Sequence, residues 1–311
     1  MITVIPAYLS RPGHPEQLSR CVAALLAGTV PTRVVVVDDG SPLPFPALPV
    51  GVELLRSPVN RGPAAARNRG LERALELGAR VVLFTDVDCV PDAGWAAAMD
   101  AFLADGAHAA AGGITRALGT TLLDRYQDFT GALNGRWLLP GHRELLYAAS
   151  CNLAVRAGAL GAVRFDERFP AAAGEDVDFC MRLRSHGPVG LATRALVRHD
   201  FDYGSTLRGL PALLRSSRRY GEADPLLWEK HPGLRRLSTE GCAAADLLAA
   251  MPPVEPEAWR RGASSRVRPR RFRPAMVLLR WIARRAYRAG QARPLPWRTA
   301  PTAIAPPPGP R

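Results

Sequence analysis

The sequence predicts an α/β fold, with helices on both faces of a mainly parallel sheet. Short apolar, β-branched runs alternate with segments of helical periodicity. Two of these runs end abruptly in carboxylates, at Asp38-Asp39 and at Asp86-Val87-Asp88. Apolar residues make up 47% of the 311 positions, which is enough for a large core. Acids that end buried strands belong at the carboxyl edge of a sheet, where open α/β folds bind ligands.

The first half of the chain alternates strands with helices. Runs rich in Val, Ile and Leu predict the buried strands, and apolar residues spaced three or four apart predict the helices. Gly28 ends the first helix, and Pro63 lies in the first turn of the second. The expected elements are a strand at 2–6, a helix at 15–28, strands at 34–37 and 52–55, a helix at 63–78, a strand at 81–84, a helix at 95–104 and a strand at 107–111.

The second half continues the pattern and then changes character. Its expected elements are a helix at 122–133, a strand at 153–155 that returns to the sheet, a helix at 176–187, short strands at 189–193 and 195–198, and a basic helix at 205–220. We expect one domain over residues 1–205, a helical extension over 206–257 and an Arg-rich segment over 258–311. That last segment should hold an amphipathic helix at 275–289 and a disordered, Pro-rich tail.

The net charge of +13 is concentrated at the carboxyl end. Residues 258–311 contain 14 Arg and no acidic residue, whereas residues 1–257 carry 27 basic and 28 acidic residues. Such a segment is either a solvated extension or a contact with an anionic membrane surface. Nucleic acid is the less favoured partner, because few aromatic residues are interleaved with the arginines.

The chain is expected to be cytoplasmic, with peripheral contact at the inner face of the membrane as an alternative. Its five cysteines are scattered without metal-ligand spacing, which fits a reducing compartment. No run of about 18 apolar residues predicts a membrane span. The first residues already form an expected strand, so no signal peptide is expected.

The two acidic clusters have a functional and a structural interpretation. In Asp38-Asp39-Gly40-Ser41, a carboxylate at a strand end can accept a base N–H or a ribose hydroxyl, but the same residues favour a capped turn. Asp86 and Asp88 can hold Mg²⁺ or Mn²⁺ on a diphosphate, although a lone pair of this spacing also suits a surface Asx turn.

Three further features carry weaker signals. The stretch from Asn60 to Asn68 opens a helix whose N-terminus attracts anions, with Arg67 one turn in. Glu175-Asp176 could supply a general base, but first-turn acids more commonly stabilise the helix dipole. His199 could bind a metal or phosphate, and a single histidine is more often structural.

Taken in order, these segments resemble the inverting family 2 glycosyltransferases of GT-A fold. The resemblance runs from Ile2 to about His199. It rests on eight segments at compatible spacing: Ile-Pro-Ala-Tyr, Val-Asp-Asp-Gly-Ser, Asn-Arg-Gly-Pro-Ala-Ala-Ala-Arg-Asn, Thr-Asp-Val-Asp, Ser-Cys-Asn-Leu-Ala-Val-Arg, Phe-Asp-Glu-Arg-Phe, Gly-Glu-Asp-Val-Asp and Val-Arg-His.

The resemblance implies a metal-dependent enzyme that moves a sugar from a nucleotide sugar to an acceptor hydroxyl, and it favours a UDP-linked donor. It also implies roles for individual positions. These are Ala7, Tyr8, Asp39, Gly62 and Arg67 at the nucleotide, with Asp39 on uracil; Asp86, Asp88 and His199 at Mn²⁺ or Mg²⁺; Ser150, Asn152 and Glu175 near the sugar and acceptor; and Asp176 as the catalytic base.

The sequence departs from processive synthases of this fold, since it lacks Gln-x-x-Arg-Trp and flanking membrane helices. One sugar per acceptor is therefore expected, on a lipid-linked, saccharide or peptide-derived acceptor. The stretches 215–221 and 230–233 resemble glycosyltransferases of mycofactocin-type clusters, which suggests the peptide-derived class. Two alternatives stay open. A nucleotidyltransferase should carry a Gly-rich, Lys-containing loop near 6–14, where no Lys occurs, and a noncatalytic adaptor would act through the basic segment.

Overall fold

The structure is a computed structural model that describes residues 1–137, 144–169, 171–234 and 269–293. Its strands are β1 (Ile2–Ala7), β2 (Arg33–Asp39), β3 (Glu53–Ser57), β4 (Val81–Phe84), β5 (Cys89–Pro91), β6 (Ala110–Ala117), β7 (Arg136–Trp137), β8 (Glu144–Tyr147), β9 (Leu153–Arg156) and β10 (Val189–His199). Its α-helices are α1 (His14–Leu26), α2 (Pro63–Glu76), α3 (Trp95–Leu103), α4 (Leu122–Thr130), α5 (Glu175–Leu183), α6 (Thr206–Lys230) and α10 (Pro269–Gln291).

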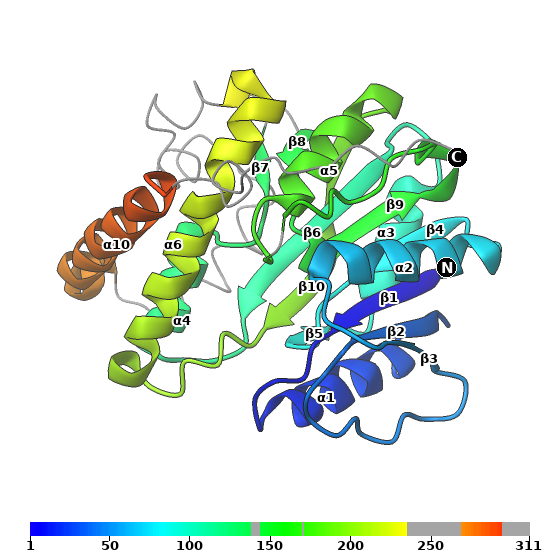
Figure 1. Ribbon diagram of the computed structural model, residues 1–311, viewed down its shortest axis with the longest axis horizontal. Helices are drawn as coiled ribbons and strands as arrows, with labels where there is room; N and C mark the ends of the chain where they lie inside the picture. Colours follow the sequence, from blue (N-terminus) through cyan, green and yellow to red (C-terminus); the bar gives the residue numbers. More distant parts are fainter. Residues whose placement is uncertain (138–143, 170, 235–268, 294–311) are drawn as a thin grey trace, which may run out of the picture.

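All the strands of the described residues belong to one sheet, in the order β3-β2-β1-β4-β9-β6-β10-β8-β7, with β5 paired to β10 (Figure 1). The strands from β3 to β4 are parallel to their neighbours, as expected from the alternation of strands and helices. Beyond β4 the sheet is mixed, because β9 runs antiparallel to both β4 and β6. The α/β class is confirmed. Its parallel pairs are those from β3 to β4 in the first half of the chain, and β6 with β10 farther along the sheet.

Alternation along the strands divides the core between the two faces of the sheet. Val35 and Val37 of β2 pack on one face, against α2, in a core cluster that also includes α5 farther along the sheet. Val34 and Val36 point to the other face, in a core cluster that includes α1 and, over β6, β9 and β10, α3. This is the side-chain alternation of a strand that is buried on both faces. The sheet is thus the middle of three layers, with α1 and α2 on opposite sides of β1–β3 (Figure 1).

Several boundaries differ from the expectation. The strand expected at 107–111 begins at Ala110, because Asp105 accepts a hydrogen bond from Ala107 N–H and Gly106 has φ of +74°, which hold a turn there. The two strands expected at 189–193 and 195–198 are one strand, β10, with a register shift between Leu191 and Leu196. The short strands β5, β7 and β8 were not expected, since each has only two to four residues; β5 and β8 pair with the distant β10, and β7 pairs with β8.

The carboxyl-terminal helices are longer than expected. α6 runs on to Lys230 with Pro211 and Pro225 inside it, and α10 packs against it. In Figure 1, α10 lies on the outer side of α6. Most of the extension expected over 206–257 beyond α6, and the Pro-rich tail expected to be disordered, lie outside the described residues. The domain boundaries remain predictions. Among the described residues, none of the helices combines the length and apolar character that crossing a membrane requires.

Candidate active site

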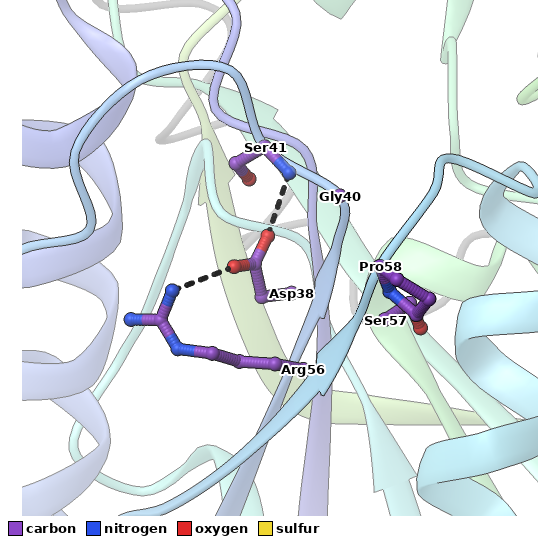
Figure 2. A pocket seen from close by; sticks show the side chains of 6 residues that line it. All are labelled: Asp38, Gly40, Ser41, Arg56, Ser57 and Pro58. Carbon is purple, nitrogen blue, oxygen red and sulfur yellow. Dashed lines mark hydrogen bonds and ion pairs between the residues drawn. The ribbon is translucent and has the colours of Figure 1, made fainter.

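A hollow of about 410 Å³ lies at the carboxyl ends of β2 and β3. Figure 2 shows the Asp38 carboxylate at its centre, accepting hydrogen bonds from Ser41 N–H at 2.9 Å and from the Arg56 guanidinium at 3.3 Å. The remaining lining residues are Gly40, Ser57 and Pro58. Arg56 also lies over the Phe45 ring, 5.3 Å from its centroid. The hollow therefore offers a buried carboxylate beside a partly exposed guanidinium at a ligand-binding edge of the sheet.

Asp39 points to the opposite side of β2 and holds the turn that begins α2. Its carboxylate accepts hydrogen bonds from Arg61 N–H at 3.0 Å and from Gly62 N–H at 2.8 Å. Gly40 has φ of +70°, and a Cβ there would lie 2.6 Å from the Val59 carbonyl carbon, so only glycine fits. Gly62 has φ of +92° and precedes Pro63, the first residue of α2. This arrangement brings the N-terminus of α2, which attracts anions, to the edge of the site.

Arg67 is the centre of a buried ion-pair network that we call the Arg67 network. Its side chain is only 2% exposed, and it donates to Asp86 Oδ1 and to Glu175 Oε1, each at 2.8 Å. Burial, with the neighbouring Asp176 charge adding to it, raises the pKa of Glu175 to about 7. Among the described residues, Arg67 Nε and Glu175 Oε2 are buried without a hydrogen-bond partner. The network joins the β4 acids to the start of α5.

Asp88 and His199 meet where β4 and β10 end. His199 Nε2 lies 3.4 Å from Asp88 Oδ1. Burial raises the pKa of the Asp88 carboxyl, with the charge of Asp86 adding to it and the histidine opposing it. Cys89 Sγ is close to both, and one ligand atom from each of the three residues lies within 4.8 Å of the others. The Cys89 thiol is the softest of the three donors and suits Mn²⁺ or Mg²⁺ less well than a carboxylate or an imidazole does. Asp88 and His199 are thus the stronger candidate ligands.

Asp176 lies in the first turn of α5, next to Glu175. Its carboxylate accepts hydrogen bonds from Val177 N–H at 2.8 Å and from Ser150 N–H at 3.3 Å. Burial raises its pKa, and the Arg67 charge opposes that shift. Ser150 therefore approaches the acid through its backbone, in the short 3₁₀ turn before β9.

Asn152 lies in the same turn, and its side chain is held by two other residues. Its Oδ1 accepts a hydrogen bond from Trp95 Nε1 at 2.8 Å, and its Nδ2 donates to Thr115 Oγ1 at 3.3 Å. Both contacts are buried. In this structure the Asn152 side chain anchors the turn that carries Ser150.

Contacts between neighbours connect most of the expected site residues. Ala7 ends β1 and pairs in register with Asp38, and the exposed Tyr8 follows it. Glu175, Asp176 and Asp86 gather around Arg67, and Asp88 follows Asp86 by two residues. Two residues that line the hollow were not predicted as site residues. Asp38 is adjacent to Asp39 in the sequence, and strand alternation separates the two carboxylates. Arg56 lies on β3, the strand next to that of Asp38, and no motif around it in the sequence predicts a contact with that acid.

The chain was compared with known proteins. The profile of the family described as Glycosyl transferase family 2 matches residues 3–167. Pre-mycofactocin glycosyltransferase from two strains of Mycobacterium tuberculosis is 33% identical over 180 residues, a match that covers 54% of this chain and 37% of that protein. The matched region is thus little more than a third of the relative's length.

A solved structure has the same fold. It is the mannosyltransferase from Pyrobaculum calidifontis in complex with GDP-Man and Mn²⁺, with a TM-score of 0.55, 16% identity, and coverage of 92% of this chain and 86% of that one. The likeness confirms the expected GT-A fold. The family profile covers more than half of the chain and includes the β2 and β4 acids. The chain therefore belongs to glycosyl transferase family 2.

Proposed function

We propose that this protein is a metal-dependent, inverting glycosyltransferase that moves one sugar from a nucleotide sugar to an acceptor hydroxyl. The Arg67 network carries the proposal, because one buried cation holds both Asp86, beside the candidate metal ligand Asp88, and Glu175, beside the candidate base Asp176. The network would thereby position the residues proposed for the donor relative to those proposed for the acceptor. Positioning of this kind supplies much of the rate enhancement in transfer reactions.

For the nucleotide we propose the edge formed by β1, β2 and the start of α2. Ala7, Tyr8 and Asp39 would contact the nucleoside, as the family resemblance implies, and Asp38 lines the adjoining hollow. Gly62 would let the diphosphate approach the N-terminus of α2. Arg67 is already engaged by two carboxylates, so we assign it the orientation of Asp86 in addition to charge near the diphosphate. The resemblance favours a UDP-linked donor.

The residues at the ends of β4 and β10 fit a divalent cation. Asp88 supplies a carboxylate whose charge is costly without a positive partner, and the His199 ring lies 3.4 Å from it. Asp86 contributes a second carboxylate that is one-quarter exposed. Oxygen and imidazole donors suit Mn²⁺, and Mg²⁺ favours the carboxylates. When bound, such an ion would neutralise charge on the departing diphosphate.

For the base we propose Asp176. A hydroxyl has a pKa far above 7, so its proton must pass to a base within about 3 Å. Asp176 would accept that proton while the acceptor oxygen bonds to the anomeric carbon and the bond to the nucleoside diphosphate breaks on the opposite face. This single displacement inverts the anomeric centre. Glu175 would stay bound to Arg67 and face the sugar with its second oxygen, and Ser150 would hold Asp176 through its N–H.

The acceptor and the location are broader proposals. The acceptor classes are lipid-linked, saccharide and peptide-derived, and the pre-mycofactocin glycosyltransferase among the relatives supports the peptide-derived class. We propose that the protein works on the cytoplasmic side, where nucleotide sugars are made. Contact with the inner face of the membrane is a separate question that depends on α10.

The decisive experiment is a panel of nucleotide sugars with Mn²⁺ or Mg²⁺, reading release of nucleoside diphosphate and thermal stabilisation. The Asp176→Asn variant should lose transfer by at least about a hundredfold and keep donor binding. Asp105→Asn, which changes an exposed acid in a turn, is the matched control. Equal loss of transfer and donor binding would contradict the base role of Asp176.

A second variant tests the metal site. Asp88→Ala should weaken donor binding only when the divalent ion is present, because the carboxylate acts through that ion. Loss of donor binding that is the same with and without the ion would instead make Asp88 a structural residue.

A further inference from the structure

The packing of α10 on α6 fixes which side of α10 faces outward. Met276, Leu279 and Ala283 are buried in a small cluster with residues of α4 and α6. Farther along, Gly290 and Gly221 bring the two helix backbones so close that a Cβ on either would lie 2.0 Å from a carbonyl oxygen of the other helix. Rotation of α10 about its axis is therefore excluded by its contacts.

Polar contacts at the same end complete the attachment. Asp224 of α6 accepts hydrogen bonds from Tyr287 and Gln291 of α10, each at 2.6 Å. Arg293 pairs with Glu222 at 2.9 Å. These acids lie on the packed side of α10. The helix is thus held as part of the folded body.

The outward side of α10 carries a continuous stripe of exposed residues. Its first half is apolar, with Val277, Leu278 and Trp281 exposed to 67%, 56% and 56%. Its second half is basic and contains the exposed residues Arg284, Arg285 and Arg288. The spacing of three and four residues places all six on one face. The Arg285 guanidinium lies over the Trp281 ring, 5.0 Å from its centroid.

We propose that this stripe docks on an anionic lipid bilayer. The six residues form an amphipathic interfacial surface, since aliphatic and Trp side chains insert at the headgroup boundary while arginines pair with lipid phosphates. The charge is complementary, because no acidic residue occurs anywhere in 258–311. Nucleic acid would engage the arginines but leave Val277 and Leu278 exposed to water, so it is the weaker partner. The proposal is independent of the glycosyl transfer chemistry.

The test uses the full chain and vesicles of phosphatidylcholine, with and without added phosphatidylglycerol. We expect co-sedimentation only with the anionic vesicles. Replacement of Arg284, Arg285 and Arg288 by Glu should weaken binding roughly a hundredfold. The double variant Leu278→Ser and Trp281→Ser should weaken it roughly tenfold or more. Arg80→Glu and Val50→Ser, both at exposed positions away from α10, are the matched controls and should bind as the parent does.

Several results would overturn the proposal. They are absence of binding to anionic vesicles, equal binding to neutral vesicles, unchanged binding by the α10 variants, and tighter binding to duplex DNA than to vesicles at the same salt concentration. Donor hydrolysis without vesicles separates this test from that of the proposed function. The α10 variants should keep hydrolysis, and Asp176→Asn should lose it while binding vesicles normally.

Discussion

Two buried charge networks meet on α5, and they differ in how well their acids are satisfied. Glu175, in the Arg67 network, shares one cation with Asp86, keeps an oxygen without a partner among the described residues, and has its pKa raised to about 7. Asp178, one turn later, accepts from Arg182, Lys230 and His231, which lower its pKa to about 2 against the opposing effect of burial.

The difference suggests different roles for the two networks: the first belongs to the candidate site, and the second supports the fold around it. Leaving one buried carboxylate oxygen of Glu175 without a partner costs free energy, which supports the proposal that a ligand uses that oxygen. Asp178, in contrast, has its partners in place. One of them, Lys230, is the only lysine of the chain, and its Nζ also lies 2.5 Å from Asp166 Oδ2. This second group, the Asp178 network, ties the end of α6 to α5 and so supports the helix that carries Asp176. We therefore expect changes in the first network to affect activity as well as stability, and changes in the second to affect stability while turnover per folded molecule stays near normal.

The largest effect is expected from Arg67→Met. It leaves the buried Glu175 and the partly buried Asp86 without their cation, which should lower the free energy of unfolding by about 3–5 kcal/mol near pH 8. The deficit should shrink toward pH 6, because Glu175 can then take up a proton. Transfer by the remaining folded protein should fall at least about a hundredfold. Urea unfolding and single-turnover assays measure the two effects.

Arg69→Met provides the matched control for that change. Arg69 is exposed on the same helix and donates to Ser57 Oγ at 2.8 Å. The Arg69→Met change should alter the free energy of unfolding by less than about 1 kcal/mol. Normal transfer by Arg67→Met would remove the basis for separating the two networks.

An intermediate effect is expected from Asp178→Asn. Because folding lowers the pKa of Asp178, its ionised form stabilises the protein above the unfolded-state value of about 4, and that stability is lost as the pH falls toward 2. The variant should be about 2 kcal/mol less stable than the parent at neutral pH and approach it in acid. Urea unfolding over this range measures the difference, and turnover per folded molecule should be near normal. A variant that folds as well as the parent but fails to turn over would give this network a catalytic role.

The smallest effect is expected from Glu175→Gln, which mimics the protonated acid. Folding raises the pKa of Glu175, so the native state holds a proton that the unfolded chain releases between about pH 4.5 and about 7. Stability of the parent should therefore fall as the pH rises through this window, and the variant should show a flatter profile. Near pH 6 the two should differ by less than about 1 kcal/mol. Parallel profiles across the window would show that Glu175 titrates normally.

Much of the fold was predictable because its signals are local. The four valines of β2, the Pro-initiated α2 and the helical spacing of α10 each predict an element without reference to the rest of the chain. The short strands β7 and β8 were not predictable, since two to four residues carry little periodicity, and β8 depends in addition on pairing with the distant β10. The length of α6 was missed for a related reason, because Pro225 predicts an end that packing against α10 overrides.

The sequence by itself determined where the carboxylates fall along the chain, because strand ends and helix starts depend on neighbouring residues. Only the tertiary structure decided which partner each carboxylate received: Arg67 for Asp86, His199 for Asp88, and Lys230 for Asp178. It also decided which side of α10 is exposed. Ion pairs and helix packing join residues up to about two hundred positions apart. The periodicity of one segment carries no information about which residue of a distant segment will contact it.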